Sequence, residues 1–195
     1  MLNYYQEILL LPQEEIPIHF LWSKVFQQIH LGLVEMQDDQ ARVPIGLSFP
    51  EYITGEKYSV LGGKLRLFAK DEAALSRFNA SQWLSRLSDY VHCTSIRPVP
   101  EKLTGYAVYQ REQPKTNKER LARRYAKRHN EDYDTAVLRY SSMVYKTIAL
   151  PFIRLKSLSG NKEFCLWIKK TEVAELSGTA FGSYGLSAVS TVPEF

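Results

Sequence analysis

The first half of the chain alternates between short apolar runs and one long helical pattern. Residues 4–11 are rich in aromatic and aliphatic side chains and end at Pro12, which predicts a β-strand. From Pro17 to about Met36 the apolar side chains recur at intervals of three and four, which predicts an amphipathic helix. Its apolar positions are Leu21, Trp22, Val25, Phe26, Ile29 and Leu33. Residues 42–49 predict a second strand, although Pro44 would confine its start to a sheet edge.

Residues 62–97 predict a further strand, a helix and a final strand. The glycine pair at 62–63 predicts a turn into a strand at residues 64–70, where apolar and polar positions alternate. Asp71 is a candidate N-cap for a helix that reaches about Leu87, with a possible break at residues 79–81. Residues 90–97 complete the set as a strand. The order β-α-β-β-α-β predicts an α+β fold with an N-terminal ferredoxin-like domain over residues 1–98, an arrangement that RNA-recognition domains share.

After Pro98 the character of the sequence changes. A strand is predicted at residues 106–111, followed by a helix that Asn117 would cap and a second helix at about 134–150. The segments 151–157 and 163–169 predict a hairpin around Ser159–Gly160. We therefore expect a second, C-terminal domain over residues 99–195 that carries a basic helix and a small β-hairpin.

Composition excludes several classes of protein. Hydrophobic residues make up 45% and charged residues 24% of the 195 residues, which is typical of a globular protein. The chain has no apolar run of the roughly 18 to 20 residues that a membrane helix needs, and its start lacks the basic region of a signal peptide. Cys93 and Cys165 stand alone, so neither a disulfide framework nor a zinc site is expected. We expect a cytoplasmic protein without membrane contact.

Charge is distributed unevenly along the chain. Residues 115–128 contain seven Lys or Arg and one acid, a net charge of +6, whereas the remaining 18 basic and 20 acidic residues give −2. Five of the cations fall within an arc of about 140° on a helical wheel. They are Arg120, Arg123, Arg124, Lys127 and Arg128. Such a stripe repels itself unless phosphates neutralise it, which indicates a nucleic-acid partner.

Two questions about this helix stay open on sequence alone. Its charges could instead pair with acidic neighbours such as Glu131 and Asp132 on a solvated face, which is the commoner role of a charge run. The stripe by itself also does not distinguish RNA from DNA.

Histidine is the candidate for catalysis. The chain has four histidines and neither an HExxH motif nor an acidic cluster, so we expect no metal and no cofactor. On the helical wheel of the first helix, His30 falls at the edge of the apolar arc, where an imidazole can titrate near neutrality and still reach a ligand. The alternative is a purely structural histidine at the edge of the apolar face, which hydrogen-bonds a carbonyl group.

Two further segments carry hydroxyl groups in unusual settings. Ser157 and Ser159 are two residues apart at a predicted strand end, and Tyr184 is flanked by glycines in FGSYGLS. Ordinary turn chemistry would explain both segments equally well.

Taken in order, these segments resemble the CRISPR repeat endoribonuclease of type I-F systems over nearly the whole chain. The matching pieces include IGLSFP (45–50), NKERLARRYAKRH (117–129), LPFIRLKSLSGNKEFCLWIKK (150–170) and FGSYGLS (181–187). No single piece would suffice, but their order and spacing are specific.

The resemblance implies roles for particular residues. His30 matches the catalytic general base, Ser157 the serine that holds the ribose 2′-OH, and Tyr184 the tyrosine that orients the histidine. Phe164 matches the residue that stacks under the last base pair, and Ser159 is an RNA-binding candidate that ranks below Ser157. Arg111 and Gln113 match two residues that bind purine edges at the base of the stem. The basic helix matches the one that enters the major groove of the hairpin.

The chemistry implied is attack of a 2′-OH on the adjacent phosphorus, which gives a 2′,3′-cyclic phosphate without a metal. The implied partners are the CRISPR repeat hairpin, before and after cleavage, and the other subunits of the type I-F surveillance complex. Two alternatives remain on sequence alone: a hairpin-binding subunit without catalysis, and a DNA-binding subunit that uses the same helix.

Overall fold

The computed structural model describes the chain except for residues 12, 114–117, 142–148, 158–159 and 161. It is a mixed α+β structure, as the sequence predicts. Contacts divide the chain into one unit made of Met1–Glu112 with Leu150–Phe195, and a second unit, Gln113–Ala149. This division differs from the boundary that we placed after residue 98, because the strands beyond residue 98 pair with one another and pack on the N-terminal region.

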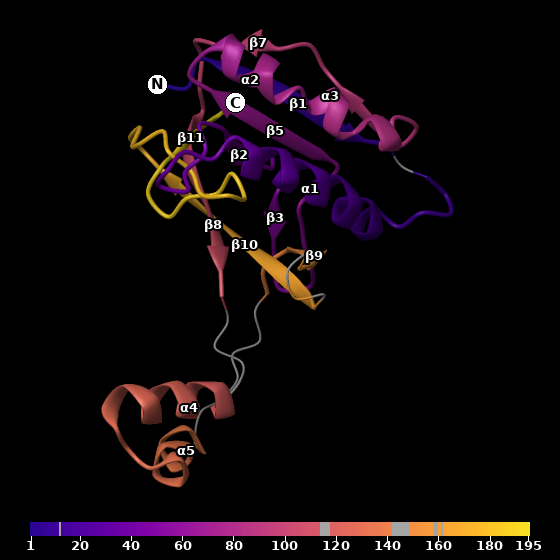
Figure 1. Ribbon diagram of the computed structural model, residues 1–195. Helices are drawn as coiled ribbons and strands as arrows, with labels where there is room; N and C mark the ends of the chain where they lie inside the picture. The colour runs from indigo at the N-terminus through magenta and orange to yellow at the C-terminus, as the bar shows by residue number, and fades with distance from the viewer. Residues whose placement is uncertain (12, 114–117, 142–148, 158–159, 161) are drawn as a thin grey trace. The chain divides into compact units, whose positions relative to one another are not determined.

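The first sheet is antiparallel and built from the N-terminal region (Figure 1). Its order is β2-β5-β1-β6, and the short β7 also pairs with β1. The bounds are β1 Tyr4–Leu10, β2 Gly46–Ser48, β5 Lys64–Ala69, β6 Val91–Cys93 and β7 Arg97–Pro98. The second strand is shorter than predicted. Val43 lies outside it because its backbone bridges to Phe181 instead, and Pro44, which follows, has no N–H to donate to a sheet.

Helix α1 (Ile18–Glu35) connects β1 to β2, and all six of its predicted apolar positions are buried. A second helical stretch connects β5 to β6 as α2 (Glu72–Phe78), α3 (Ala80–Trp83) and a 3₁₀ turn, η1 (Ser85–Leu87). The Asp71 side chain caps α2 by accepting a hydrogen bond from the Ala74 amide at 2.8 Å. Asn79 ends α2 in the left-handed conformation with φ 50°, so the predicted cap and the predicted break are both confirmed.

The second sheet has the order β11-β8-β10-β9 and is also antiparallel. Its strands are β8 Gly105–Glu112, β9 Phe152–Lys156, β10 Glu163–Val173 and β11 Val192–Glu194. The predicted β9–β10 hairpin is confirmed. The edge strand β11 and a two-stranded hairpin, β3 (Ile53–Thr54) with β4 (Ser59–Val60), were not predicted. Helix α1 contacts β1 of the first sheet and β9 of the second, so its apolar face belongs to a core shared by both sheets.

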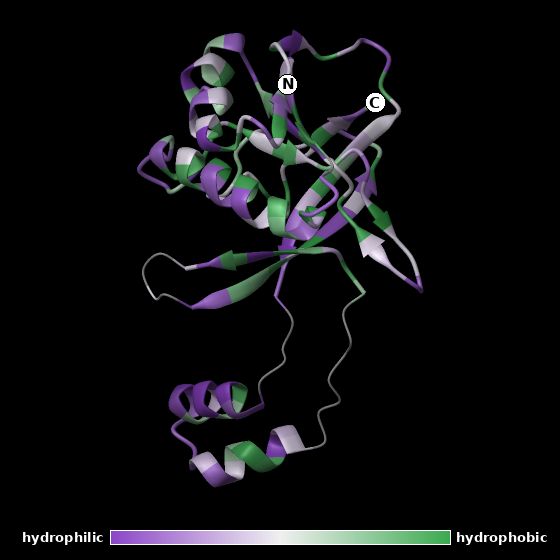
Figure 2. Ribbon diagram, turned by 90° about the vertical axis from the view of Figure 1, so that its right-hand side faces the viewer, coloured by the Kyte–Doolittle hydropathy of each residue, from purple (hydrophilic) through white to green (hydrophobic). Residues whose placement is uncertain are grey.

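The second unit consists of α4 (Lys118–His129) and α5 (Tyr133–Ser141) within its described part. The two helices pack on each other, and Ala122 of α4 and Ala136 of α5 are each fully buried. Tyr125 adds an edge-on contact with Tyr140 at a centroid distance of 6.3 Å. In Figure 2, α4 is hydrophilic along most of its length, whereas α5 carries a mixture of apolar and polar residues. The predicted cap Asn117 and the end of the second predicted helix lie outside the described residues.

Candidate functional site

His30 lies on α1 with its imidazole half-buried. The Nδ1 atom is 2.8 Å from the carbonyl oxygen of Ser183. A carbonyl oxygen can only accept a hydrogen bond, so Nδ1 must carry the proton in the neutral ring. The lone pair is therefore on Nε2, which makes Nε2 the atom that can accept a proton from a ligand.

The ring of Tyr184 lies flat against the imidazole. The two ring centroids are 4.2 Å apart and the planes differ by 10°. A ring packed this closely against the imidazole face limits rotation of the imidazole about its χ2 angle.

Backbone hydrogen bonds hold the segment 181–187 in place. The Val43 amide donates to the Phe181 carbonyl at 2.8 Å and the Leu47 amide donates to the Gly185 carbonyl at 2.9 Å. On its other side, the Ser187 amide donates to the Tyr109 carbonyl of β8 at 2.9 Å. The segment is thus fixed to both sheets, and this fixes the two groups that contact His30.

The electrostatic surroundings keep His30 neutral. Burial lowers the pKa of His30 below its ordinary value, the Ser183 carbonyl opposes that change, and the positive charge of Arg111 adds to the lowering. The pKa falls because the charged imidazolium form is disfavoured both by lost hydration and by a nearby cation. At neutral pH the ring therefore retains its free lone pair.

Arg111 connects this histidine to the β9–β10 hairpin. Its guanidinium carbon lies 5.4 Å from the ring centroid of Tyr184 and 5.4 Å from that of Phe164. Both distances are within the range of a cation–π contact. Four of the predicted residues, His30, Tyr184, Arg111 and Phe164, thus form one continuous series of contacts.

Ser157 follows β9 at the start of the hairpin turn. Its amide donates to the Lys162 carbonyl at 2.8 Å, and its hydroxyl oxygen accepts a hydrogen bond from the Gly160 amide at 3.3 Å. The turn chemistry that the sequence allowed is therefore present at Ser157. Ser159 lies outside the described residues.

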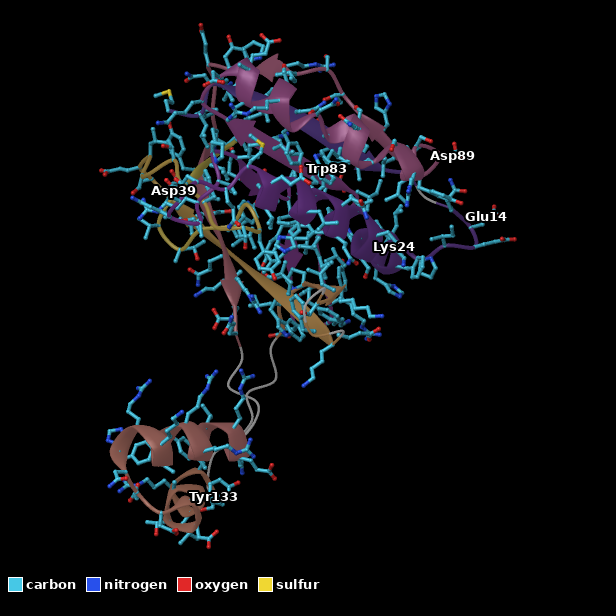
Figure 3. All side chains as sticks on the ribbon, in the orientation of Figure 1. Glu14, Lys24, Asp39, Trp83, Asp89 and Tyr133 are labelled. Carbon is cyan, nitrogen blue, oxygen red and sulfur yellow. The ribbon has the colours of Figure 1, made fainter. Side chains whose placement is uncertain are left out.

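The five predicted cations of α4 are all exposed: Arg120, Arg123, Arg124, Lys127 and Arg128. Figure 3 shows nitrogen-tipped side chains extending from α4 on the side away from α5. The two acids that could have neutralised them are engaged elsewhere. Glu131 pairs with Arg139 at 3.1 Å, and Asp132 accepts hydrogen bonds from the first amides of α5.

Within the described part of α4, the last four of these cations form no ion pair. The helix therefore presents a positively charged surface to solvent. Gln113, at the start of the same unit, is also exposed.

Sequence reasoning missed Ser183. Its contribution is a backbone carbonyl, and no side-chain pattern marks a carbonyl that will face a residue 153 positions away. The one available signal for this contact was the glycine-flanked setting of Tyr184. It indicates that the backbone there can come close to another group, but it does not identify that group. Among the described residues, no group of three His, Cys, Asp or Glu side chains could hold a metal ion. No described helix is long and apolar enough to cross a membrane.

Fold and site together define an α+β protein with an oriented, neutral histidine and a separate basic helix. The model of the family described as "CRISPR-associated protein (Cas_Csy4)" matches residues 5–195, and the chain belongs to that family. The resemblance noted in the sequence is thereby confirmed.

Two full-length relatives carry the name "CRISPR-associated endonuclease Cas6/Csy4". One, from Escherichia coli strain UTI89, is 34% identical over 195 residues, and the other, from Pseudomonas aeruginosa strain UCBPP-PA14, is 35% identical over 197 residues. Each alignment covers 100% of both proteins. Among solved structures, a "CRISPR associated protein Cas6" covers 100% of this chain and 99% of its own, with 13% identity and a TM-score of 0.32. That overlap is too low to support any inference.

Proposed function

We propose that this chain is a metal-independent endoribonuclease that cuts CRISPR precursor RNA at the 3′ base of the repeat hairpin. After cleavage it stays bound to the hairpin as a subunit of the surveillance complex. The observation that carries the proposal is the geometry of His30, whose Nε2 lone pair is free while a carbonyl and a stacked ring hold the imidazole. Family membership and the names of the two relatives support the substrate class.

The reaction is a transesterification within the RNA. Nε2 of His30 accepts the proton of a ribose 2′-OH as its oxygen attacks the adjacent phosphorus. The O2′–P bond forms and the P–O5′ bond breaks. The leaving O5′ takes up a proton from water, and His30 releases the proton that it accepted to solvent. The products are a 2′,3′-cyclic phosphate and a 5′-OH end. Because the nucleophile belongs to the substrate, positioning and general-base catalysis, worth about 10² to 10⁴ in rate, can drive the reaction without a metal-bound water.

In this proposal Ser157 holds the attacking 2′-OH and Tyr184 holds the imidazole plane. Phe164 stacks under the last base pair of the stem, with Ser159 close to the same strand of RNA. Half-exposed aromatic rings are suited to this because every base has a face that can stack. The neighbouring guanidinium of Arg111 is exposed and free to bind a purine edge.

The remaining RNA contacts come from Gln113 and from the exposed cations of α4, which would lie along the hairpin's major groove. Their side chains provide charge for phosphate contacts, while arginine can also bind bases in a bidentate manner. By role, the proposal assigns a ferredoxin-like catalytic domain to residues 1–98 and an RNA-binding domain to residues 99–195, a division that differs from the two units defined by contacts. The strand order β2-β5-β1-β6, with helices after β1 and β5, supports the first of these.

The test compares three proteins on a labelled repeat hairpin from the same genome, in EDTA. Wild type and His19→Ala should cut, because His19 is an exposed histidine on the same helix and serves as the matched control. His30→Ala should bind the hairpin and leave it intact. A 2′-deoxy substitution at the cleaved nucleotide should also abolish cleavage, which excludes a DNA substrate. If no protein cuts while all three bind, the chain is a hairpin-binding subunit without catalysis.

A further inference from the structure

An open apolar groove lies at the N-terminal end of α1, apart from the residues assigned to catalysis or RNA. Its volume is about 710 Å³. Three segments line it: the first turns of α1, β4 with the glycine pair that follows, and the start of β9. All three belong to the first unit.

Large apolar side chains in this groove are exposed to solvent. Phe20 is 51%, Ile18 46%, Phe152 41% and Val60 40% exposed. Ile53 pairs directly opposite Val60 on the β3–β4 hairpin, so its side chain, which is 50% exposed, extends the same surface. Contiguous exposed apolar side chains from several segments indicate an interaction surface, whereas single ones are ordinary.

The groove is preformed. Its floor is Trp22, which is 3% exposed and whose indole N–H donates to the Gly62 carbonyl at 2.8 Å. Glu51 fixes the neighbouring turn, because its carboxylate accepts a hydrogen bond from the Gly63 amide at 2.6 Å. A partner would therefore meet a rigid surface and lose little affinity to rearrangement of this chain.

The charged side chain among the described lining residues of the groove is Arg154, and none of these lining residues is acidic. Lys24, labelled in Figure 3, lies one turn after Phe20 with its ammonium 5.1 Å from the Phe20 ring centroid. The Glu51 carboxylate at the neighbouring turn accepts a hydrogen bond from the Gly63 amide. An apolar centre with a basic rim complements an apolar segment that carries acidic residues beside it.

Protein fits this surface better than the other ligand classes. A small molecule is normally enclosed over most of its surface, but the groove leaves Phe20 and Phe152 about half exposed. An RNA strand needs cations along its phosphates, yet much of the lining is aliphatic, from Ile18, Val60 and Leu61.

We propose that this groove is the docking site for an apolar, acid-flanked segment of another protein subunit of the surveillance complex. The proposal rests on the complex membership proposed above. Phe20 and Phe152 anchor the segment by burying their exposed rings against it, and Arg154 and Lys24 pair with its acids. Docking at the start of α1 leaves the catalytic histidine, near the other end of the helix, free to act.

The experiment measures two properties of each variant: cleavage of the hairpin by the purified chain, and binding of the RNA-bound chain to the other protein subunits encoded at the same CRISPR locus. Phe20→Gln and Val60→Gln should each weaken subunit binding about tenfold or more and leave cleavage unchanged. Arg154→Glu should weaken binding most at low salt. Leu138→Gln, at a 71% exposed position of α5, is the matched control and should change neither property.

Unchanged subunit binding in both groove variants overturns the docking site. A loss of hairpin affinity without a loss of subunit binding overturns it as well, because the groove would then bind RNA. The two proposals fail separately. A wild-type chain that cuts RNA but binds no subunit refutes complex membership and the docking site together and leaves the nuclease standing. A chain that fails to cut but assembles through Phe20 refutes only the nuclease.

Discussion

Replacing Gly185 by alanine should damage both stability and catalysis. Gly185 has φ +67°, a conformation that costs a side-chain-bearing residue roughly 1 to 2 kcal/mol. A Cβ atom there would collide with Leu47 Cγ and come within 2.9 Å of its Cδ1 and 3.2 Å of Leu33 Cδ1. Overpacking of this kind costs roughly 1 to 3 kcal/mol. The two costs together predict a loss of about 2 to 5 kcal/mol in the free energy of unfolding.

The same substitution should slow the chemical step, because Ser183 and Tyr184 directly precede Gly185 and would move with it. A displacement of about 1 Å at a catalytic group can cost about 100-fold in rate. Urea unfolding gives the stability, and single-turnover cleavage at saturating RNA gives the rate. Gly55→Ala is the matched control, since its Cβ would meet only the Tyr58 carbonyl oxygen at 3.4 Å. If the Gly185 variant is as stable and as active as this control, the segment does not hold the histidine.

Three further outcomes are expected. The cleavage rate of wild type should rise with pH through a midpoint below about 6.5 and be level at neutrality. The reason is that the pKa of His30 is lowered and only its neutral form accepts a proton. A midpoint above 7 in the pH–rate profile would contradict this. Arg111→Gln should raise the pKa of His30 in the free protein, seen as an upward shift of its NMR titration, because a nearby positive charge is removed. Arg123→Ala should weaken hairpin binding and reduce the salt dependence of log K by about one unit, whereas Arg139→Ala, whose charge is already paired with Glu131, should change that slope less.

Periodicity was sufficient for the elements that bury one continuous face. Helix α1, which contains His30, and strand β1 follow directly from spacing, because each needs only its own apolar pattern to be recognised. The β3–β4 hairpin and β11 were missed for the opposite reason. Two- and three-residue strands such as Ser59–Val60 and Val192–Glu194 are too short for a period to develop, and their pairing depends on partners elsewhere in the fold.

The candidate site shows a similar limit. The wheel placed His30 at the edge of a buried face, and the structure has it half-buried there. His30 also hydrogen-bonds a carbonyl group, as a purely structural histidine would. That contact alone therefore does not decide between a catalytic and a structural histidine. What spacing could not supply is the stacked ring of Tyr184 and the nearby charge of Arg111, because these arise from packing between distant segments. The structure brings four of the candidate residues into contact, but the roles assigned to all of the candidate site residues remain predictions.

The 153-residue separation between His30 and the carbonyl that orients it has a consequence for biosynthesis. A ribosome adds about 5 to 20 residues per second, so the histidine is made about 8 to 30 s before Ser183. Strand β8 likewise waits for β10 and β11, which follow it in the chain. A nascent chain therefore has His30, the proposed general base, long before it has the groups that hold the imidazole in place. Activity should appear late in synthesis, after the basic helix has already left the ribosome and can engage RNA.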